Sequence, residues 1–404
     1  MRRFSSLPEI LVAGLIVGLA AIPIPALWSS DFDSDSDVDL TDFSGFTACF
    51  NGPNRAPAAF CAVDADLDDD TDVDLADFGV FAACFNGPNR PPACTTDPPP
   101  PGMVLILAGE FQMGDTFNDG PTDGRELPVH AVYVDGFYID QYEVTNQQYA
   151  DALNWANGQG GHITVAGGVV YKYSGTTYPY CETTTTTSNS RITWNGSAFG
   201  VTAGKENHPM VNVSWYGAVA YANWRSGMQD KPLCYSLSTW ECNWNDGYRL
   251  PTEAEWEKAA RGGVAGQRFP WGNTVNHDHT NYWACGSCYS YDTSPYSDYT
   301  FHPDFDDGGT PHTGPVGYFA PNGHGLYDMA GNLHEWCNDR WGSFYYSSSP
   351  YDNPRGPTSG PERVIRGGNW ASGADECRSA FRRSGLPTAT GEYSRGFRCA
   401  AGSP

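Results

Sequence analysis

The chain has 404 residues, of which 14% are aromatic, with 13 Trp and 46 Gly. This composition excludes a disordered chain, and the length exceeds what one ordinary core serves, so we expect more than one domain. The formal net charge of -24 excludes nucleic acid and anionic membrane surfaces as expected partners.

An export signal is predicted at the N-terminus. Arg2 and Arg3 precede an apolar run over residues 10–27, and Ser29-Ser30 follow it. This is the order of a secretory signal peptide cleaved after Ala26, or of an uncleaved membrane anchor. The 12 Cys also favour an oxidising compartment. We therefore assign residues 1–28 to a signal peptide or membrane anchor and expect a secreted, periplasmic or cell-surface protein, with membrane contact only if the segment stays uncleaved.

Residues 29–94 contain a tandem acidic repeat, DFDSDSDVDLTDF over 31–43 and DLDDDTDVDLADF over 66–78. Acidic residues at positions 1, 3, 5, 9 and 12 are the oxygen ligands of an EF-hand-type calcium loop, and position 7 contributes its carbonyl. The alternative is a solvated acidic linker. The predicted calcium ligands are Asp31, Asp33, Asp35, Asp37, Asp39 and Asp42 in the first loop, and Asp66, Asp68, Asp70, Asp72, Asp74 and Asp77 in the second.

Each loop is followed by apolar residues at helical spacing, and this duplicated loop and helix resemble a dockerin-type module. Position 6, usually Gly in such loops, is Ser36 and Thr71 here, which weakens the expected calcium affinity. We predict two local disulfides, Cys49–Cys61 and Cys84–Cys94, because so small a module cannot bury a strong core. The resemblance implies docking to a cohesin-like or cell-surface protein. Residues 95–102 form a Pro-rich linker.

The remaining residues predict strands and helices in alternation. Residues 103–114 indicate a strand, a turn and a second strand, and residues 129–139 a short hairpin. Helices are expected over 147–155, 216–226 and from Thr252 to about residue 261. Thr145 or Asn146 is the expected N-cap of the first helix, and Thr252 with Glu255 forms a capping box for the third. Residues 158–204 predict irregular structure or small strands.

The C-terminal third carries motifs dense in Gly, Trp and Arg. They are GLYDMAGNLHEW over 325–336, RVIRGGNW over 363–370, CRSAFR over 377–382 and GFRC over 396–399. Together with residues 142–145, 249–256 and 269–272, they resemble the formylglycine-generating, or sulfatase-modifying factor, family over residues 103–401. The resemblance implies an irregular, loop-rich α+β fold related to C-type lectins, to which the small helical calcium-loop module is added.

Two calcium sites are expected in this domain. A Gly-rich turn between Asp328 and Glu335 can aim the carbonyls of Gly331 and Leu333 at one point between two carboxylates, which suits calcium, and the family's structural site falls on these positions. Capping by Asp328 and a salt bridge from Glu335 form the alternative. The resemblance implies a second site from Asn281, the Tyr282 carbonyl, Asp307 and the Gly309 carbonyl.

The family's catalytic pair falls on Ser372 and Cys377. Members of the family oxidise a substrate cysteine to formylglycine with O₂ and a copper ion held by two thiolates. Soft thiolates select copper(I), and a serine hydroxyl is a poor ligand for it. Cys377 is therefore a catalytic candidate whose partner ligand is missing.

Two functions of different classes follow. The first is a calcium-stabilised binding or scaffold protein without oxidase activity, whose large domain takes a peptide or protein ligand. The second is an active copper-dependent oxidase acting on a sulfatase-type client, and copper is expected only in this case.

The domain's Cys suggest several disulfides. Cys234 and Cys242 flank a short loop and are expected to bridge. His277-Asp278-His279 before Cys285-Gly286-Ser287-Cys288 would suit zinc, but Cys pairs of exported proteins are more often disulfides. Related sequences imply a Cys337–Cys377 bridge, with Cys377–Cys399 as the alternative.

Overall fold

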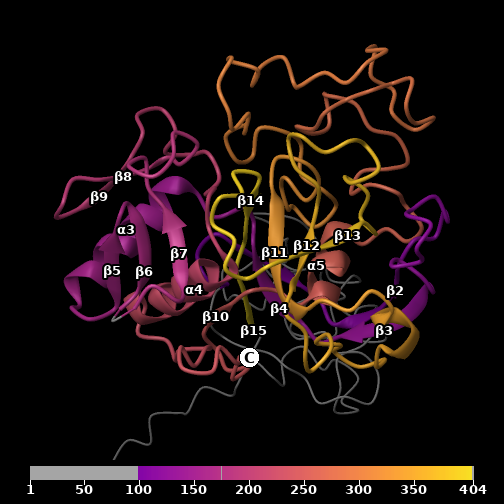
Figure 1. The fold of residues 1–404 in the computed structure, drawn as a ribbon. Helices are drawn as coiled ribbons and strands as arrows, with labels where there is room; N and C mark the ends of the chain where they lie inside the picture. Colours follow the sequence, from indigo (N-terminus) through magenta and orange to yellow (C-terminus); the bar gives the residue numbers. More distant parts are fainter. Residues whose placement is uncertain (1–98, 174, 403–404) are drawn as a thin grey trace, which may run out of the picture.

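The structure is a computed structural model that describes residues 99–173 and 175–402. The predicted signal segment, the tandem calcium loops with their four Cys, and the first half of the Pro-rich linker lie outside these residues. The described part has three α-helices, many short strands and long connecting loops (Figure 1). The expected loop-rich α+β fold is therefore confirmed. Within the described ranges, no helix has the length and apolar character needed to cross a membrane.

The two ends of the domain meet in one antiparallel sheet. β1 (Met103–Ile106) pairs with β4 (Phe137–Asp140). β15 (Ala400–Gly402) lies between β4 and β10 (Tyr248–Arg249). Because β15 is an inner strand, this sheet is complete only when the C-terminal residues have paired with β4 and β10.

A separate two-stranded sheet joins β2 (Gly109–Met113) to β3 (His130–Val134). The strands thus form where the sequence predicted them, but β3 and β4 belong to different sheets, so the hairpin expected over 129–139 is wrong. The reason is burial. All residues of β4 are buried between β1 and β15, whereas β3 alternates between buried and partly exposed positions and suits a two-stranded ribbon.

The C-terminal motifs build a second four-stranded sheet in the order β13-β12-β11-β14. Its strands are β11 (His334–Arg340), β12 (Arg363–Arg366), β13 (Arg382–Gly385) and β14 (Arg395–Gly396). β14 runs parallel to β11, and the other pairs are antiparallel. The loop over residues 367–381, which connects β12 to β13, carries Ser372 and Cys377 and positions the candidate site.

The three helices are α3 (Asn146–Gly158), α4 (Trp215–Met228) and α5 (Glu253–Ala260). All three were predicted, and the first two extend one to three residues beyond the expected ends. Thr145 caps α3 in a capping box with Gln148, and Thr252 caps α5 in the predicted capping box with Glu255. Ser214 caps α4 by accepting a hydrogen bond from Gly217 N.

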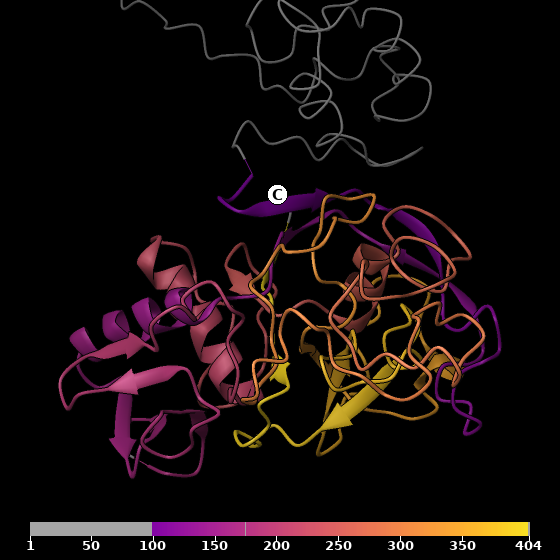
Figure 2. The same cartoon turned by 90° about the horizontal axis from the view of Figure 1, so that it is seen from above.

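The segment after α3 adds small strands, as expected for residues 158–204. They are β5 (Ile163–Ala166), β6 (Val169–Lys172), β7 (Pro179–Glu182), β8 (Ile192–Trp194) and β9 (Phe199–Val201). Figures 1 and 2 both place these strands with α3 and α4 on one side of the domain and the β11–β14 sheet beside them. A short 3-10 helix, η2 (Tyr345–Ser348), follows β11.

The apolar interior is divided into separate clusters. The Trp336 cluster, which includes Phe397, packs α3 and α4 against the C-terminal motifs. The Trp256 cluster lies between α5 and the strands β1 to β4. The Tyr282 cluster, which includes Phe269, lies under the loops that follow α5. Each of Trp336, Trp256 and Tyr282 is fully buried.

Buried ion pairs join α5 to the second sheet. Glu257 Oε2 lies 2.5 Å from Arg366 Nη2, and Glu253 Oε2 lies 2.6 Å from Arg382 Nη2. Both arginines are fully buried. A buried charge without its partner costs about 3–5 kcal/mol, so these pairs fix α5 against β12 and β13.

Candidate functional site

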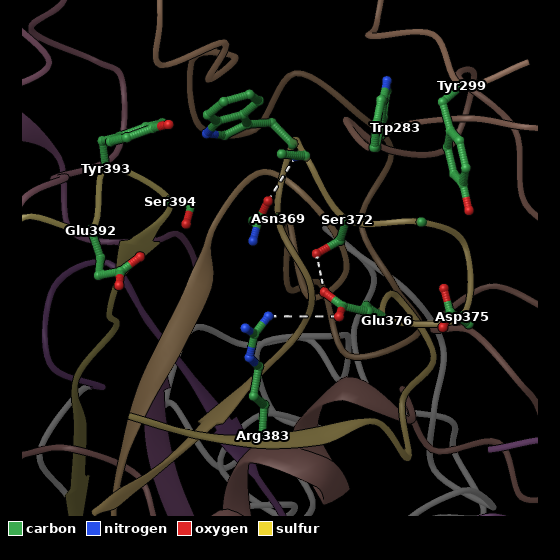
Figure 3. Close-up of a pocket in the computed structure, with 13 residues that line it drawn as sticks. Trp283, Tyr299, Asn369, Ser372, Asp375, Glu376, Arg383, Glu392, Tyr393 and Ser394 are labelled. Atoms are coloured by element: carbon green, nitrogen blue, oxygen red, sulfur yellow. Dashed lines mark hydrogen bonds and ion pairs between the residues drawn. The ribbon is translucent and has the colours of Figure 1, made fainter. Parts of the chain in front are cut away.

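A pocket of about 490 Å³ opens at the loop between β12 and β13. Three segments line it: residues 283–299, the 369–383 stretch and residues 392–394. Figure 3 shows Trp283 and Tyr299 on one side, Glu392 and Tyr393 on the other, and Ser372 between them. Ser372, at the first catalytic position of the resembling family, therefore belongs to the pocket wall.

Backbone turns fix the shape of this wall. Asn369 Oδ1 accepts a hydrogen bond from Ala371 N at 2.7 Å, and Ser372 N donates to Asn369 O at 2.9 Å. Gly368 precedes this turn with a φ of +75°, and a Cβ there would meet Cys377 Sγ at 2.9 Å. Glycine is therefore needed for the loop to fold back over Cys377.

Cys377 lies in the interior and not at the pocket surface. Its side chain is fully buried in the Tyr282 cluster. Burial, followed by the nearby carboxylates of Glu376 and Asp375, raises the pKa of the Cys377 thiol well above its usual range. The thiol is therefore protonated at neutral pH while no metal ion is bound, and copper would have to displace this proton.

The pair Ser372 and Cys377 does not fit copper(I). Ser372 Oγ donates a 2.5 Å hydrogen bond to Glu376 Oε2, so its hydroxyl is already engaged. Within the described ranges, no group of three or more His, Cys, Asp or Glu side chains could hold a metal ion. The site offers one buried, protonated thiol where copper chemistry needs two thiolates.

Glu376 is the centre of the polar contacts, and sequence reasoning missed it. Its Oε2 lies 3.6 Å from His334 Nε2, and its Oε1 lies 3.6 Å from Arg383 Nη1. Burial alone would raise the pKa of Glu376, but His334, Ser372 and Arg383 lower it to about 2. Burial lowers the pKa of His334, so a neutral imidazole faces an ionised carboxylate at neutral pH. The signal that could have identified Glu376 is its place next to Cys377 in the chain.

The first predicted calcium site is a cluster of buried carboxylates. Glu335 Oε1 pairs with Arg398 Nη2 at 2.7 Å, and Glu335 Oε2 accepts from Trp256 Nε1 at 2.8 Å. Asp328 Oδ2 accepts from Gly317 N at 2.7 Å. The salt bridge from Glu335 is thus formed, as in the alternative that the sequence left open, whereas Asp328 bonds a loop amide and caps none of the described helices.

Glu143 is a third buried carboxylate at this place. Its oxygens accept from Asn332 Nδ2 at 2.7 Å and from Leu333 N at 3.2 Å. Burial, then repulsion from Asp328 and Glu335, raises the pKa of Glu143 well above its usual range. Burial likewise raises the pKa of Asp328 to about 6. Glu143 lies in the 142–145 stretch, where no ligand or catalytic residue was predicted.

The turn over residues 328–335 brings these groups together. Asp328, Gly331 and Asn332 all have positive φ values, so the backbone between Asp328 and Glu335 is a tight, irregular turn. Three carboxylates then face one guanidinium, that of Arg398, which leaves an excess of negative charge. Because the described residues include no group of three or more His, Cys, Asp or Glu arranged to hold a metal ion, only this charge favours a cation at the predicted ligands Asp328, Glu335 and the carbonyls of Gly331 and Leu333, and calcium stays a prediction.

The second predicted calcium site is divided between two environments. Asn281 is buried, donates to His312 O at 2.7 Å and leaves its Oδ1 without a hydrogen-bond partner in the described structure. The Tyr282 carbonyl lies 3.1 Å from His277 Nε2. Asp307, with a side chain 58% exposed, pairs with Lys205 at 3.6 Å, and Gly309 is exposed. A calcium ion would have to draw this exposed loop inward.

The disulfides differ from those expected. Cys337, Cys377 and Cys399 are free thiols, so neither predicted bridge of Cys377 is formed. The reason is that Cys337 lies in the Trp256 cluster, Cys377 in the Tyr282 cluster and Cys399 in the Trp336 cluster.

Cys234 and Cys242 are also unbonded, although a hydrogen bond joins their side chains. The expected bridge is thus absent, but the two thiols are neighbours. Cys285–Cys288, in the segment beside the pocket, is a disulfide, which confirms the preference for a disulfide over zinc at that pair.

Residues 90–402 match the family described as the sulfatase-modifying factor enzyme 1-like domain. The chain is 35% identical to a formylglycine-generating enzyme of Streptomyces coelicolor, over 74% of this chain and 88% of that protein. It is 30% identical to a protein of Bos taurus named inactive C-alpha-formylglycine-generating enzyme 2, again over 74% and 88%. The solved structure of Treponema denticola variable protein 1 aligns with a TM-score of 0.52 and 26% identity, over 75% of this chain and 95% of that one.

Glu376→Gln should remove a pH-dependent part of the stability. The folded-state pKa of about 2 lies below the ordinary 4.5, so the carboxylate stabilises the fold above pH 4.5, and this contribution is lost as the pH falls towards 2. Because the side chain is 27% exposed, we expect about 2 kcal/mol rather than the full linkage value.

Urea unfolding at about pH 6 and about pH 3 measures this difference. Glu241→Gln is the control, because its carboxylate pairs with Arg340 and is 68% exposed. If the wild type and Glu376→Gln lose the same free energy of unfolding between about pH 6 and about pH 3, the role given to Glu376 is contradicted.

Proposed function

Because the chain belongs to the family of sulfatase-modifying factor enzyme 1-like domains, we propose that it is a member that binds a ligand and does not oxidise cysteine. The observation that carries the proposal is the pair at the catalytic positions. Ser372 lines the pocket and is hydrogen-bonded to Glu376, and Cys377 is buried beneath with its thiol protonated. One relative is named an inactive formylglycine-generating enzyme, and this name supports the proposal that the family includes members without oxidase activity.

The second candidate is an active copper-dependent oxidase that converts a cysteine of a sulfatase-type client to formylglycine. Its support is the 35% identity to a formylglycine-generating enzyme and the retention of Cys377 beside a pocket of about 490 Å³. This candidate requires a second thiolate. The chain has no Cys at residue 372, and the other described Cys lie in different clusters or in the Cys285–Cys288 disulfide.

The full-length protein, loaded with copper(I) and given O₂ and a thiol as reductant, should leave the cysteine of a Cys-x-Pro-x-Arg peptide unchanged, as measured by mass spectrometry. The physical reason is the missing soft ligand at Ser372. Ser372→Cys is the matched variant, and we expect it to bind copper(I) at least about tenfold more tightly in competition with a chromophoric chelator. Turnover by the wild type that disappears in Cys377→Ser would overturn the proposal and establish the oxidase.

Calcium is the cofactor that we propose for the large domain, bound near Asp328. The excess negative charge of Glu143, Asp328 and Glu335 over Arg398 supports it, because a divalent cation would offset both the burial and the weaker repulsion that raise the pKa values of Glu143 and Asp328. Without calcium, the raised pKa of Asp328 means that stability falls as the pH rises from about 4 to about 6.

Asp328→Ala should abolish the stabilisation that calcium gives to the large domain. At a calcium concentration about 100 times the dissociation constant, the wild type should gain about 2.7 kcal/mol, read as a rise in the melting temperature of the large-domain transition. Glu335→Ala is a poorer test, because it also leaves Arg398 buried without its partner. Asp123→Ala, in an exposed loop, is the control. Equal calcium responses in Asp328→Ala and the control would leave Asp328 with its hydrogen bond to Gly317 alone.

For the N-terminal segment we propose a dockerin-like arm in an exported protein. The support is the sequence alone: two aligned acidic loops at 31–42 and 66–77, followed by a Pro-rich stretch. Such an arm would bind calcium and dock to a cohesin-like or cell-surface protein, so that the large domain is presented outside the cell.

Asp31→Ala and Asp66→Ala should each lower the calcium stoichiometry of the full-length protein by one site, because position 1 supplies a carboxylate in each loop. Isothermal titration calorimetry gives this stoichiometry. Asp64→Ala changes an acidic residue just outside the second loop and should leave the stoichiometry intact. If both loop variants bind as much calcium as Asp64→Ala, the acidic repeat is a solvated linker.

A further inference from the structure

Two stacked aromatic pairs border the pocket. Trp283 and Tyr299 stack with ring centroids 4.3 Å apart and 28° between their planes, and Trp370 and Tyr393 stack at 5.8 Å and 25°. Tyr299 is 41% exposed, and Trp283 and Tyr393 are partly exposed. Figure 3 shows Tyr393 on the side opposite Trp283 and Tyr299. Trp283 also stacks on Phe301, with ring centroids 5.7 Å apart, so a ligand in this pocket meets the exposed ring of Tyr299 beside Trp283 on one side and the partly exposed ring of Tyr393 on the other.

Three carboxylates, Asp375, Glu376 and Glu392, and one guanidinium, that of Arg383, line the pocket. Glu376 lies 3.6 Å from Arg383, whose side chain is 48% exposed, so this pair is weak. Asp375 accepts a hydrogen bond from the Tyr289 hydroxyl, and burial together with this bond raises the pKa of Tyr289. Carboxylates accept hydrogen bonds from hydroxyl groups. The lining therefore suits a ligand rich in hydroxyl donors and disfavours an anion.

Polar groups of both kinds remain available to such a ligand. Glu392 is 48% exposed and can accept further hydrogen bonds. Asn369 uses its Oδ1 within the turn, and its amide group can donate. Trp370 lines the pocket, but its Nε1–H is buried and lies beyond the direct reach of a ligand. Carboxylate and guanidinium groups are planar and match two adjacent hydroxyls at once.

We propose that this pocket binds a neutral sugar, as one or two pyranose units of an oligosaccharide. A pyranose has one face of C–H groups, which would pack on Trp283 and Tyr299, and a rim of hydroxyls, which would bond Glu392 and Asn369. The volume of about 490 Å³ lies within the range of roughly 300–1,000 Å³ for small-molecule sites. The inference rests on the proposed binding function, because it needs the pocket free of copper chemistry.

The test uses the full-length protein and four neutral probes: cellohexaose, xylohexaose, mannohexaose and maltohexaose. Binding is followed by tryptophan fluorescence and by calorimetry. We expect saturable binding of at least one probe, weakened at least about tenfold in Trp283→Ala and less in Glu392→Gln. Phe344→Ala is the control, because Phe344 is 70% exposed and does not line the pocket. Its affinity should equal that of the wild type. A melting temperature equal to that of the wild type shows that a variant is folded. If Trp283→Ala does not fold, the affinity of Glu392→Gln tests the proposal.

Two results would overturn the sugar proposal. One is the absence of binding by all four neutral probes, and saturable binding of spermidine or heparin would then identify a charged ligand. The other is equal affinity in the wild type and both pocket variants, which would locate the sugar elsewhere. The peptide oxidation assay separates this failure from that of the binding function. If no sugar binds and the peptide is not oxidised, only the sugar proposal fails. If the peptide is oxidised in a reaction that depends on Cys377, both the sugar proposal and the proposed binding function fail.

Discussion

Buried pairs of carboxylate and guanidinium groups hold this domain in one arrangement. Its strands are short and its loops long, so backbone ladders alone do not fix how the parts pack. Glu253 and Glu257 on α5 bind Arg382 and Arg366 on the second sheet, and Glu335 binds Arg398 beside the first sheet. Each group is costly to bury alone, so only the arrangement that pairs all of them is stable.

The same constraint shapes the pocket. Arg366 and Arg382 stand at the two ends of the 367–381 loop and are held by α5. Within the loop, Arg378 is buried against Glu126 at 2.7 Å. The loop is thus tied down at its ends and in the middle, and only the stretch around Ser372 reaches the pocket. This explains how two positions five residues apart, Ser372 and Cys377, come to lie in different environments.

The chemistry of the pocket follows from that division. A thiol kept protonated by burial and a serine hydrogen-bonded to Glu376 form no soft-metal site, while the aromatic rings and carboxylates around them can hold an uncharged ligand rich in hydroxyl groups. A separate group of carboxylates, Glu143, Asp328 and Glu335, lies near Arg398. Its excess charge is the best support in this domain for a bound cation.

The sequence by itself determined the fold class, the family, the three helices with their caps, and the substitution at Ser372, because these depend on local patterns. Thr252 and Glu255 specify a capping box wherever the helix lies. Only the tertiary structure decided which strands pair, which Cys meet, and which carboxylates gather. β3 and β4 separate because one is buried on both faces and the other is not, and Cys337 and Cys377 separate because they enter different clusters. Glu143 joins Asp328 and Glu376 joins His334 across long stretches of chain, and no local pattern encodes such contacts.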